Sequence, residues 1–146
     1  MIVKIEAEVR PTESKDKVVK ALRNLFSITS LKESKEGNYI RLIASSRGAE
    51  LLNKFHSLLR RQRILDAARQ YLSRGKREGG VTFYLNKQVA YIGKISFCSF
   101  EYGESPLGAI VVKIKTENPD MLIDWLAPPT SEGVPIERVK FPPEDP

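Results

Sequence analysis

The residues of this sequence that could do chemistry are concentrated in one short basic segment. Between positions 60 and 77 the 146-residue chain carries seven basic residues and one acid, Asp66, so the segment has a net charge of +6, equal to that of the whole chain. The basic residues are Arg60, Arg61, Arg63, Arg69, Arg74, Lys76 and Arg77. Arginine binds phosphate through paired hydrogen bonds and stacks on bases. The segment therefore favours a polyanion such as RNA as partner, the alternative being an ordinary solvated helix face.

The spacing of its apolar residues predicts that residues 60–74 of this segment form an amphipathic helix. At 100° per residue, one side carries Ile64, Leu65, Ala68, Tyr71 and Leu72. Arg60, Arg63 and Arg74 fall on the opposite side, and the basic pair at 76–77 extends the stripe into a loop. We therefore expect a helix that is pinned to a sheet by its apolar side and presents guanidinium groups to solvent.

A second polar segment follows at 86–94 and is a secondary candidate for RNA contact. Lys87, Gln88 and Lys94 lie in a stretch that is too polar for a purely buried element. The structural alternative is that Asn86 caps a short helix and Gln88 bonds local backbone. The sequence does not decide between these two interpretations.

The residues that usually perform catalysis are scarce. His56 is the single histidine and Cys98 the single cysteine, so neither a zinc site nor a Cys–His nucleophilic pair is indicated. Glu101 and Glu104 flank a Tyr-Gly turn in a segment that we expect to be an exposed loop, and we interpret them as solvated carboxylates. Gly75 and Gly80 have the spacing of the two glycines in a phosphate-binding loop, but Val81 occupies the lysine position and a strand is expected where that loop needs a helix. The sequence therefore gives no positive indication of an enzyme, a cofactor or a metal.

The elements that must position these residues follow from hydrophobic periodicity. Strict alternation predicts a half-buried strand at 2–10, helical spacing predicts a helix after Pro11, and turn residues at 36–38 join a hairpin with arms at 28–35 and 39–45. Residues 47–73 form one helix or two, because Arg61 would fall on the apolar side of a continuous helix. We further expect a flexible connection at 76–80, strands at 81–85, 93–100, 107–116 and 135–141, a short helix at 86–91, and a helix between Asn118 and Pro128.

Interspersed strands and helices predict an α+β fold, a two-layer sandwich in which helices pack on one face of a mixed β-sheet. The length fits a single domain, which we place at 1–141, followed by a loose C-terminal tail at 142–146. A single cysteine permits no internal disulfide and suits a reducing, cytoplasmic location. The first residues lack the apolar run of a signal peptide, and no apolar stretch is long enough to cross a membrane.

Several runs resemble the signature of a small archaeal family. They are Leu59 to Arg69, Leu85 to Lys94, Glu104 to Gly108, Asp124 to Pro128 and the opening Ile5 to Thr12. Together they cover nearly the whole chain, in the same order, and the sequence is similar to uncharacterised protein family 0201, a probable RNA-binding domain family. The resemblance implies an archaeal cytoplasmic protein with a two-layer α+β fold like that of the 5S-RNA-binding ribosomal protein of the large subunit, and a structured RNA as the suspected ligand.

Two other functions remain open at this point. The chain could be a protein-interaction or assembly module, as a homodimer or a ribosome-associated scaffold, in which case apolar surface should be exposed near Trp125 or in the Pro-rich tail. It could also be an enzyme with an unrecognised site, for which a deep pocket would have to gather Arg63, Lys87, Glu101 and Glu104. RNA binding through the Arg-rich helix is the interpretation that the charge pattern favours.

Overall fold

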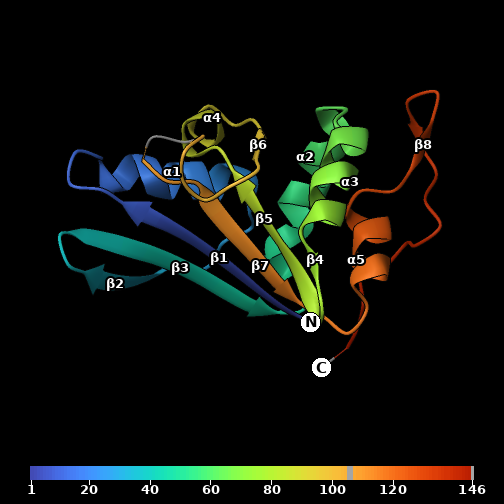
Figure 1. The fold of residues 1–146 in the computed structure, drawn as a ribbon, viewed down its shortest axis with the longest axis horizontal. Helices are drawn as coiled ribbons and strands as arrows, with labels where there is room; N and C mark the ends of the chain where they lie inside the picture. The colour runs from blue at the N-terminus through green and yellow to red at the C-terminus, as the bar shows by residue number, and fades with distance from the viewer. Residues whose placement is uncertain (105–106, 146) are drawn as a thin grey trace.

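The computed structural model describes residues 1–104 and 107–145 and has two layers, with helices on one side of a large sheet (Figure 1). The first half contains β1 (Ile2–Val9), α1 (Lys15–Leu25), β2 (Lys32–Glu36), β3 (Tyr39–Arg47), a 3₁₀ turn (Glu50–Leu52), α2 (Asn53–Arg61) and α3 (Leu65–Arg74). The second half contains β4 (Lys76–Arg77), β5 (Gly80–Leu85), α4 (Lys87–Tyr91), β6 (Phe97–Cys98), β7 (Ile110–Lys115), α5 (Pro119–Leu126), β8 (Thr130–Ser131) and β9 (Val134–Pro135). Ser105, Pro106 and Pro146, from the segments 104–108 and 142–146 considered above, lie outside the described residues.

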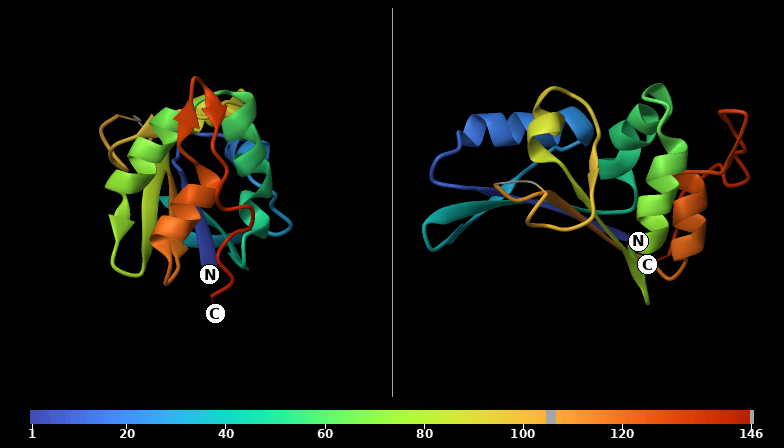
Figure 2. Two further views of the ribbon diagram at one scale, coloured as in Figure 1. Left: turned by 90° about the vertical axis from the view of Figure 1, so that its right-hand side faces the viewer. Right: turned by 45° about the horizontal axis from the view of Figure 1, so that its top comes forward.

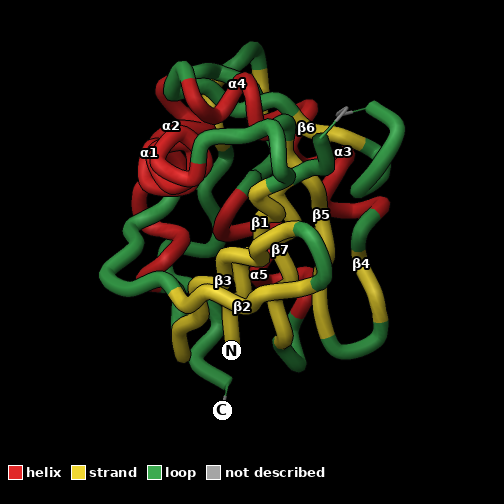
Figure 3. Tube along the Cα trace, turned by 90° about the vertical axis from the view of Figure 1, so that its left-hand side faces the viewer, coloured by secondary structure: helices red, strands yellow, loops and turns green. Residues whose placement is uncertain are grey.

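The large sheet has the strand order β2-β3-β1-β7-β5-β4, and β6 pairs with the far end of β5. Every strand pairing in the described part of the chain is antiparallel, so the sheet is antiparallel where a mixed one was expected. Alternation in β1 turns Val3, Ile5, Ala7 and Val9 toward the helices, where they are buried. The other side of the sheet, which we call the open face, carries no helix (Figure 3). The α+β class is confirmed.

The core between the layers is joined by a run of aromatic rings. Phe55 of α2 stacks on Phe26, just after α1, with ring centroids 5.2 Å apart, and on Phe83 of β5 at 5.6 Å. Phe26 and Phe55 are at most 1 % exposed. Because α1, α2 and β5 meet through these rings, the helix layer is fixed in position over the sheet.

The basic segment is two helices, which answers the question that the sequence left open. The chain turns at Gln62 to Ile64, between α2 and α3, and Arg63 adopts the left-handed conformation with φ of 58°. The Gln62 side chain fastens the turn, because its amide donates to the Ile95 carbonyl at 2.7 Å and accepts from the Ile95 N–H at 2.9 Å. The continuous helix assumed for 60–74 is therefore wrong, and its two parts face different surroundings.

Several strands are shorter than predicted. The expected strands at 93–100 and 107–116 reduce to Phe97–Cys98 and Ile110–Lys115, while the connection at 76–80 contains β4, which pairs with the start of β5. Near the C-terminus, Val134–Pro135 forms only a two-residue strand against Thr130–Ser131. Within the described part of the tail, the Asp145 carboxylate accepts from the Thr116 hydroxyl at 2.6 Å and pairs with the N-terminal amine at 3.3 Å. The two chain ends accordingly lie close together (Figure 1).

Candidate nucleic-acid interface

The Arg60 side chain forms its contacts within the protein. It sits in the last turn of α2, and its guanidinium donates to the carbonyls of Trp125 and Leu126 at 3.1 and 3.3 Å. The same group also forms an ion pair with Glu137. These carbonyls end α5, so Arg60 caps that helix and complements the negative end of its dipole. The prediction that Arg60 points to solvent is wrong, because the break at Gln62 directs α2 toward α5.

Arg69 and Lys76 are engaged with α5 in the same way. Arg69 donates to the Ala127 carbonyl at 3.1 Å and pairs with Asp124 at 2.8 Å. Lys76 pairs with Asp120 at 2.9 Å. Figure 2 shows α5 beside α3 at one end of the molecule. Acids from the C-terminal helix therefore neutralise part of the predicted basic stripe.

Four arginines of the segment stay exposed. Arg61 and Arg63 form no ion pair with the described residues, and they flank the turn between α2 and α3. Arg74 lies over the Tyr71 ring at 5.3 Å from its centroid. Arg77 donates to two main-chain carbonyls, at Arg74 and Lys76, each at 3.1 Å. These four side chains remain candidates for phosphate contact.

The residues of the second predicted surface, at 86–94, differ in their exposure and contacts. Lys87 is 3 % exposed, and its ammonium donates to the carbonyls of Glu8 and Leu107 and to the Glu13 carboxylate at 2.7 to 2.8 Å. Burial lowers the pKa of Lys87, although Glu13 opposes that effect. Lys87 is thus buried and connects α4 to β1 and to the segments of Glu13 and Leu107, whereas the sequence placed it among the candidates for RNA contact. Asn86 caps α4 by accepting from the Val89 N–H at 2.9 Å, as the structural alternative predicted, while Gln88 and Lys94 are exposed.

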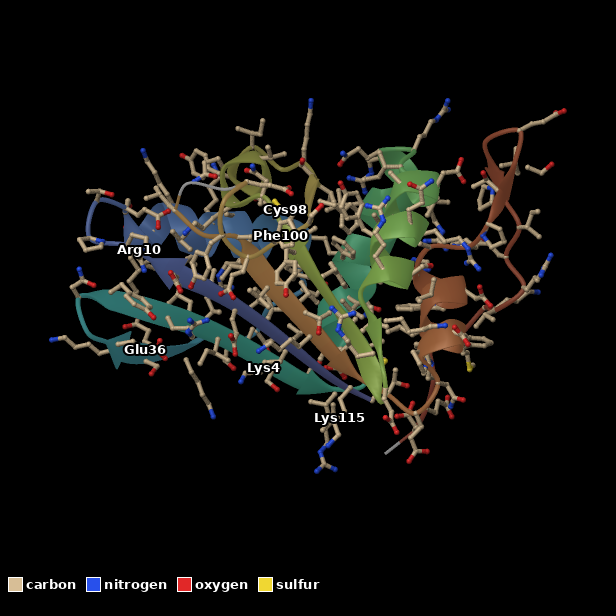
Figure 4. The ribbon with its side chains drawn as sticks, in the orientation of Figure 1. Lys4, Arg10, Glu36, Cys98, Phe100 and Lys115 are labelled. Atoms are coloured by element: carbon tan, nitrogen blue, oxygen red, sulfur yellow. The ribbon has the colours of Figure 1, made fainter. Side chains whose placement is uncertain are left out.

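The sheet places a further group of basic residues together that the sequence reasoning missed. On the open face, the register aligns Arg77, Gly80, Lys115, Ile2 and Arg47 in one row across five neighbouring strands. The adjacent row contains Thr82, Lys113, Lys4 and Ser45. We call the five basic side chains of these two rows the basic rows. Figure 4 shows Lys4 and Lys115 on the side of the sheet away from α1.

Four members of the basic rows, all except Arg47, border a shallow hollow of about 350 Å³. Gly80 lies between Arg77 and Lys115 in the row, where the backbone of Ile114 comes too close for a side chain. Arg47, Lys113 and Lys115 form no ion pair with the described residues, whereas Lys4 pairs with Glu6 at 2.8 Å. Burial raises the pKa of Glu6, but Lys4, Lys113 and Arg41 together lower it further, so Glu6 is ionised. Two acids, Glu6 and, at the rim of the hollow, Glu78, thus stand against five cations.

The remaining part of the open face is covered and electrically balanced. Glu8 is 2 % exposed and accepts from Arg10 at 2.9 Å, from Arg41 at 3.2 Å and from the Tyr102 hydroxyl. The hydrogen bond to Glu8 raises the pKa of Tyr102 to about 12. The loop after β6 is thereby fastened over this half, because Tyr102 belongs to it. The half with the basic rows carries more cations than acids, five against Glu6 and Glu78.

The described residues show no constellation for metal binding. No group of three or more His, Cys, Asp or Glu side chains among residues 1–104 and 107–145 could hold a metal ion. Cys98 is buried, and burial raises the pKa of its thiol. Glu104 accepts from the Ser99 N–H at 3.0 Å within its own loop. In the same described part, no helix is both long and apolar enough to span a membrane.

Comparison with known proteins gives consistent matches. A family model described as RNA binding matches residues 2–116. A UPF0201 protein of Sulfolobus acidocaldarius is 49 % identical over 141 residues, covering 97 % of both chains. A UPF0201 protein of Sulfurisphaera tokodaii is 50 % identical over the same length. The crystal structure of a UPF0201 protein from Methanococcus jannaschii superposes with a TM-score of 0.80 at 37 % identity, covering 93 % of this chain and 99 % of the other. The chain belongs to the UPF0201 family, whose members in these comparisons are archaeal.

Proposed function

We propose that the protein binds RNA and that the RNA phosphates lie along the basic rows of the open face. The observation that carries the proposal is the alignment of Lys4, Arg47, Arg77, Lys113 and Lys115 in two adjacent rows of one sheet. Neighbouring strands are about 4.8 Å apart and alternate residues about 6.6 Å apart. The five cations thus form a compact patch, and a patch of this kind attracts a polyanion and positions its backbone.

The RNA-binding description of the family model supports the proposal independently of the charge argument. The matched residues 2–116 contain all five members of the basic rows but exclude α5 and its acids. The conclusion is therefore an RNA-binding protein whose contacts are made to phosphate.

The Arg-rich helices supply a second contact surface in this proposal. Arg61, Arg63 and Arg74 are exposed and form no ion pair with the described residues. Arg74 and Arg77 line a small hollow together, so the helix surface continues into the basic rows at that point. Arg60 and Arg69 are left out, because they cap α5.

The test is the affinity for a mixed-sequence RNA over a salt series. One variant replaces Arg77, Lys113 and Lys115 by glutamate, and a second replaces Arg61, Arg63 and Arg74 in the same way. A matched control replaces Lys35, Arg138 and Lys140, which are exposed and lie outside both surfaces. All three variants change the net charge equally, so differences between them report the position of the charge.

We expect the sheet variant to bind at least about tenfold more weakly and to lower the slope of log affinity against log salt by about 2, because each lost contact to single strands removes about 0.7. The helix variant should lose less, and the control should stay near the wild type. Equal losses in the sheet variant and the control would overturn the placement of the site. Absence of binding by the wild type would overturn the function itself.

A further inference from the structure

The loop after β6 carries an aromatic side chain that the fold leaves uncovered, one residue beyond a hollow that Arg77 also lines. Phe100, in the loop after β6, is 66 % exposed and forms no ring contact with the described residues. Other large rings of this region, Phe83 and Phe97, are packed against one another in the core. An exposed phenylalanine has an apolar face in water, which is unfavourable unless a partner covers it.

The loop that carries Phe100 is held in place on both sides of it. The Tyr102 hydroxyl donates to the buried Glu8 carboxylate, and the Ser99 N–H donates to Glu104 at 3.0 Å. The Ala109 N–H donates to the Glu101 carbonyl at 2.9 Å and closes the loop. Phe100 is therefore presented from an anchored position, which reduces the entropy that binding would cost.

The position of Phe100 continues the path of the basic rows. A small hollow at the edge of the sheet is lined by Arg74, Arg77, Thr82, Tyr84 and Ser99. Arg77 and Thr82 also line the hollow of the basic rows, so the two hollows adjoin. Phe100 directly follows Ser99, which lines the first of these hollows, and Figure 4 shows it beside Cys98.

We propose, on the basis of the proposed function, that the RNA bound here is single-stranded and that one of its bases stacks on Phe100 while its phosphates follow Arg77 and the basic rows. A basic groove beside an exposed ring is the combination by which proteins hold single strands, because every base has a face that can stack. In an RNA duplex the base faces are stacked on one another and cannot reach such a ring. The substrate class is thus unpaired RNA.

The experiment compares a single-stranded oligouridylate with a blunt RNA duplex of equal length, by fluorescence anisotropy at fixed salt. Three variants are measured beside the wild type: Phe100→Ala, Phe100→Trp, and Ile92→Ala as a control. Ile92 is 68 % exposed at the end of α4 and offers a similar loss of exposed apolar surface. All changes are at exposed positions, and circular dichroism verifies that each variant folds.

We expect the wild type to prefer the single strand, and Phe100→Ala to weaken that binding by roughly 5- to 150-fold, the range for loss of one base stack. Phe100→Trp should retain the affinity, and Ile92→Ala should leave it unchanged. A wild type that prefers the duplex, or a Phe100→Ala variant that binds the single strand normally, overturns the inference. Either of those results still leaves RNA binding by the basic rows intact, whereas failure of the wild type to bind any RNA overturns the proposed function.

Discussion

Replacing Arg60 by alanine should destabilise the fold while leaving RNA affinity nearly unchanged. The Arg60 guanidinium holds two carbonyls at the end of α5, those of Trp125 and Leu126. Both residues are buried, at 6 % and 0 % exposure, so water is a poor substitute for the lost donor. The prediction separates a structural arginine from a ligand-binding one within a single basic segment.

The magnitude follows from the contacts. A hydrogen bond to a charged group contributes about 1.5–3 kcal/mol, and such contributions are not additive when one side chain makes both. The ion pair with Glu137 is partly exposed and adds about 0–1 kcal/mol. We therefore expect Arg60→Ala to lower the free energy of unfolding by about 3 kcal/mol. The stability of Arg60→Lys should lie between those of the wild type and Arg60→Ala, because an ammonium lacks the planar guanidinium that reaches two carbonyls.

Urea unfolding followed by circular dichroism measures this difference, with Arg61→Ala as the matched control. Arg61 is the next residue, is exposed and forms no ion pair with the described residues, so its loss should stay within about 0.5 kcal/mol. Equal unfolding midpoints for the two variants would refute the capping role. If Arg60→Ala lost RNA affinity without losing stability, Arg60 would have to be assigned to the RNA-binding surface.

Three further predictions concern buried and paired groups. Lys87→Met should lower the free energy of unfolding by about 3–5 kcal/mol, because it removes the buried ammonium that pairs with Glu13 and donates to two carbonyls. Urea unfolding checks this, and an equal effect of Lys94→Met would contradict it. Spectrophotometric titration should find one phenol with a pKa of about 12, absent in Tyr102→Phe. Its bond to Glu8 therefore stabilises the fold fully below the ordinary tyrosine pKa near 10 and is lost as pH rises through 12. For Asp145, burial raises the pKa but hydrogen bonds and the N-terminal amine lower it further. The stabilisation that Asp145 gives the fold is therefore present above the ordinary aspartate pKa and is lost as pH falls through the lowered value. Asp145→Asn should remove this pH dependence from the thermal unfolding midpoint, and midpoints at acid pH that equal those of the wild type would argue against it.

The sequence alone predicts where the basic segment lies in the chain, but it does not predict which distant residues pack against that segment. Periodicity places Arg60 and Arg69 on helices. The acids and carbonyls that bind their guanidinium groups lie about sixty residues further along the chain. A hydrophobic pattern records which side of a helix is apolar and carries no information about which distant helix ends against it. The break at Arg63 has the same origin, because the turn is fastened by Gln62 binding the main chain of Ile95.

The basic rows were missed for a related reason. Alternation correctly predicts that Lys4 lies on the exposed side of its strand, and Lys113 and Lys115 alternate with buried residues in the same way. Their meeting depends on β1 pairing with β7, a contact between the first and last strands of the sheet. Local pattern predicts exposure, whereas strand order, which the sequence alone left open, determines which exposed residues are neighbours.

Ultraviolet crosslinking of a bound oligouridylate, with the crosslinked peptides identified by mass spectrometry, tests the central claim most directly. Uridine attached to peptides containing Arg77, Phe100 and the segment 113–115 is the predicted result, since these positions border the proposed path. Crosslinks confined to α2, α3 or the hairpin of β8 and β9, with none on the open face, would contradict it.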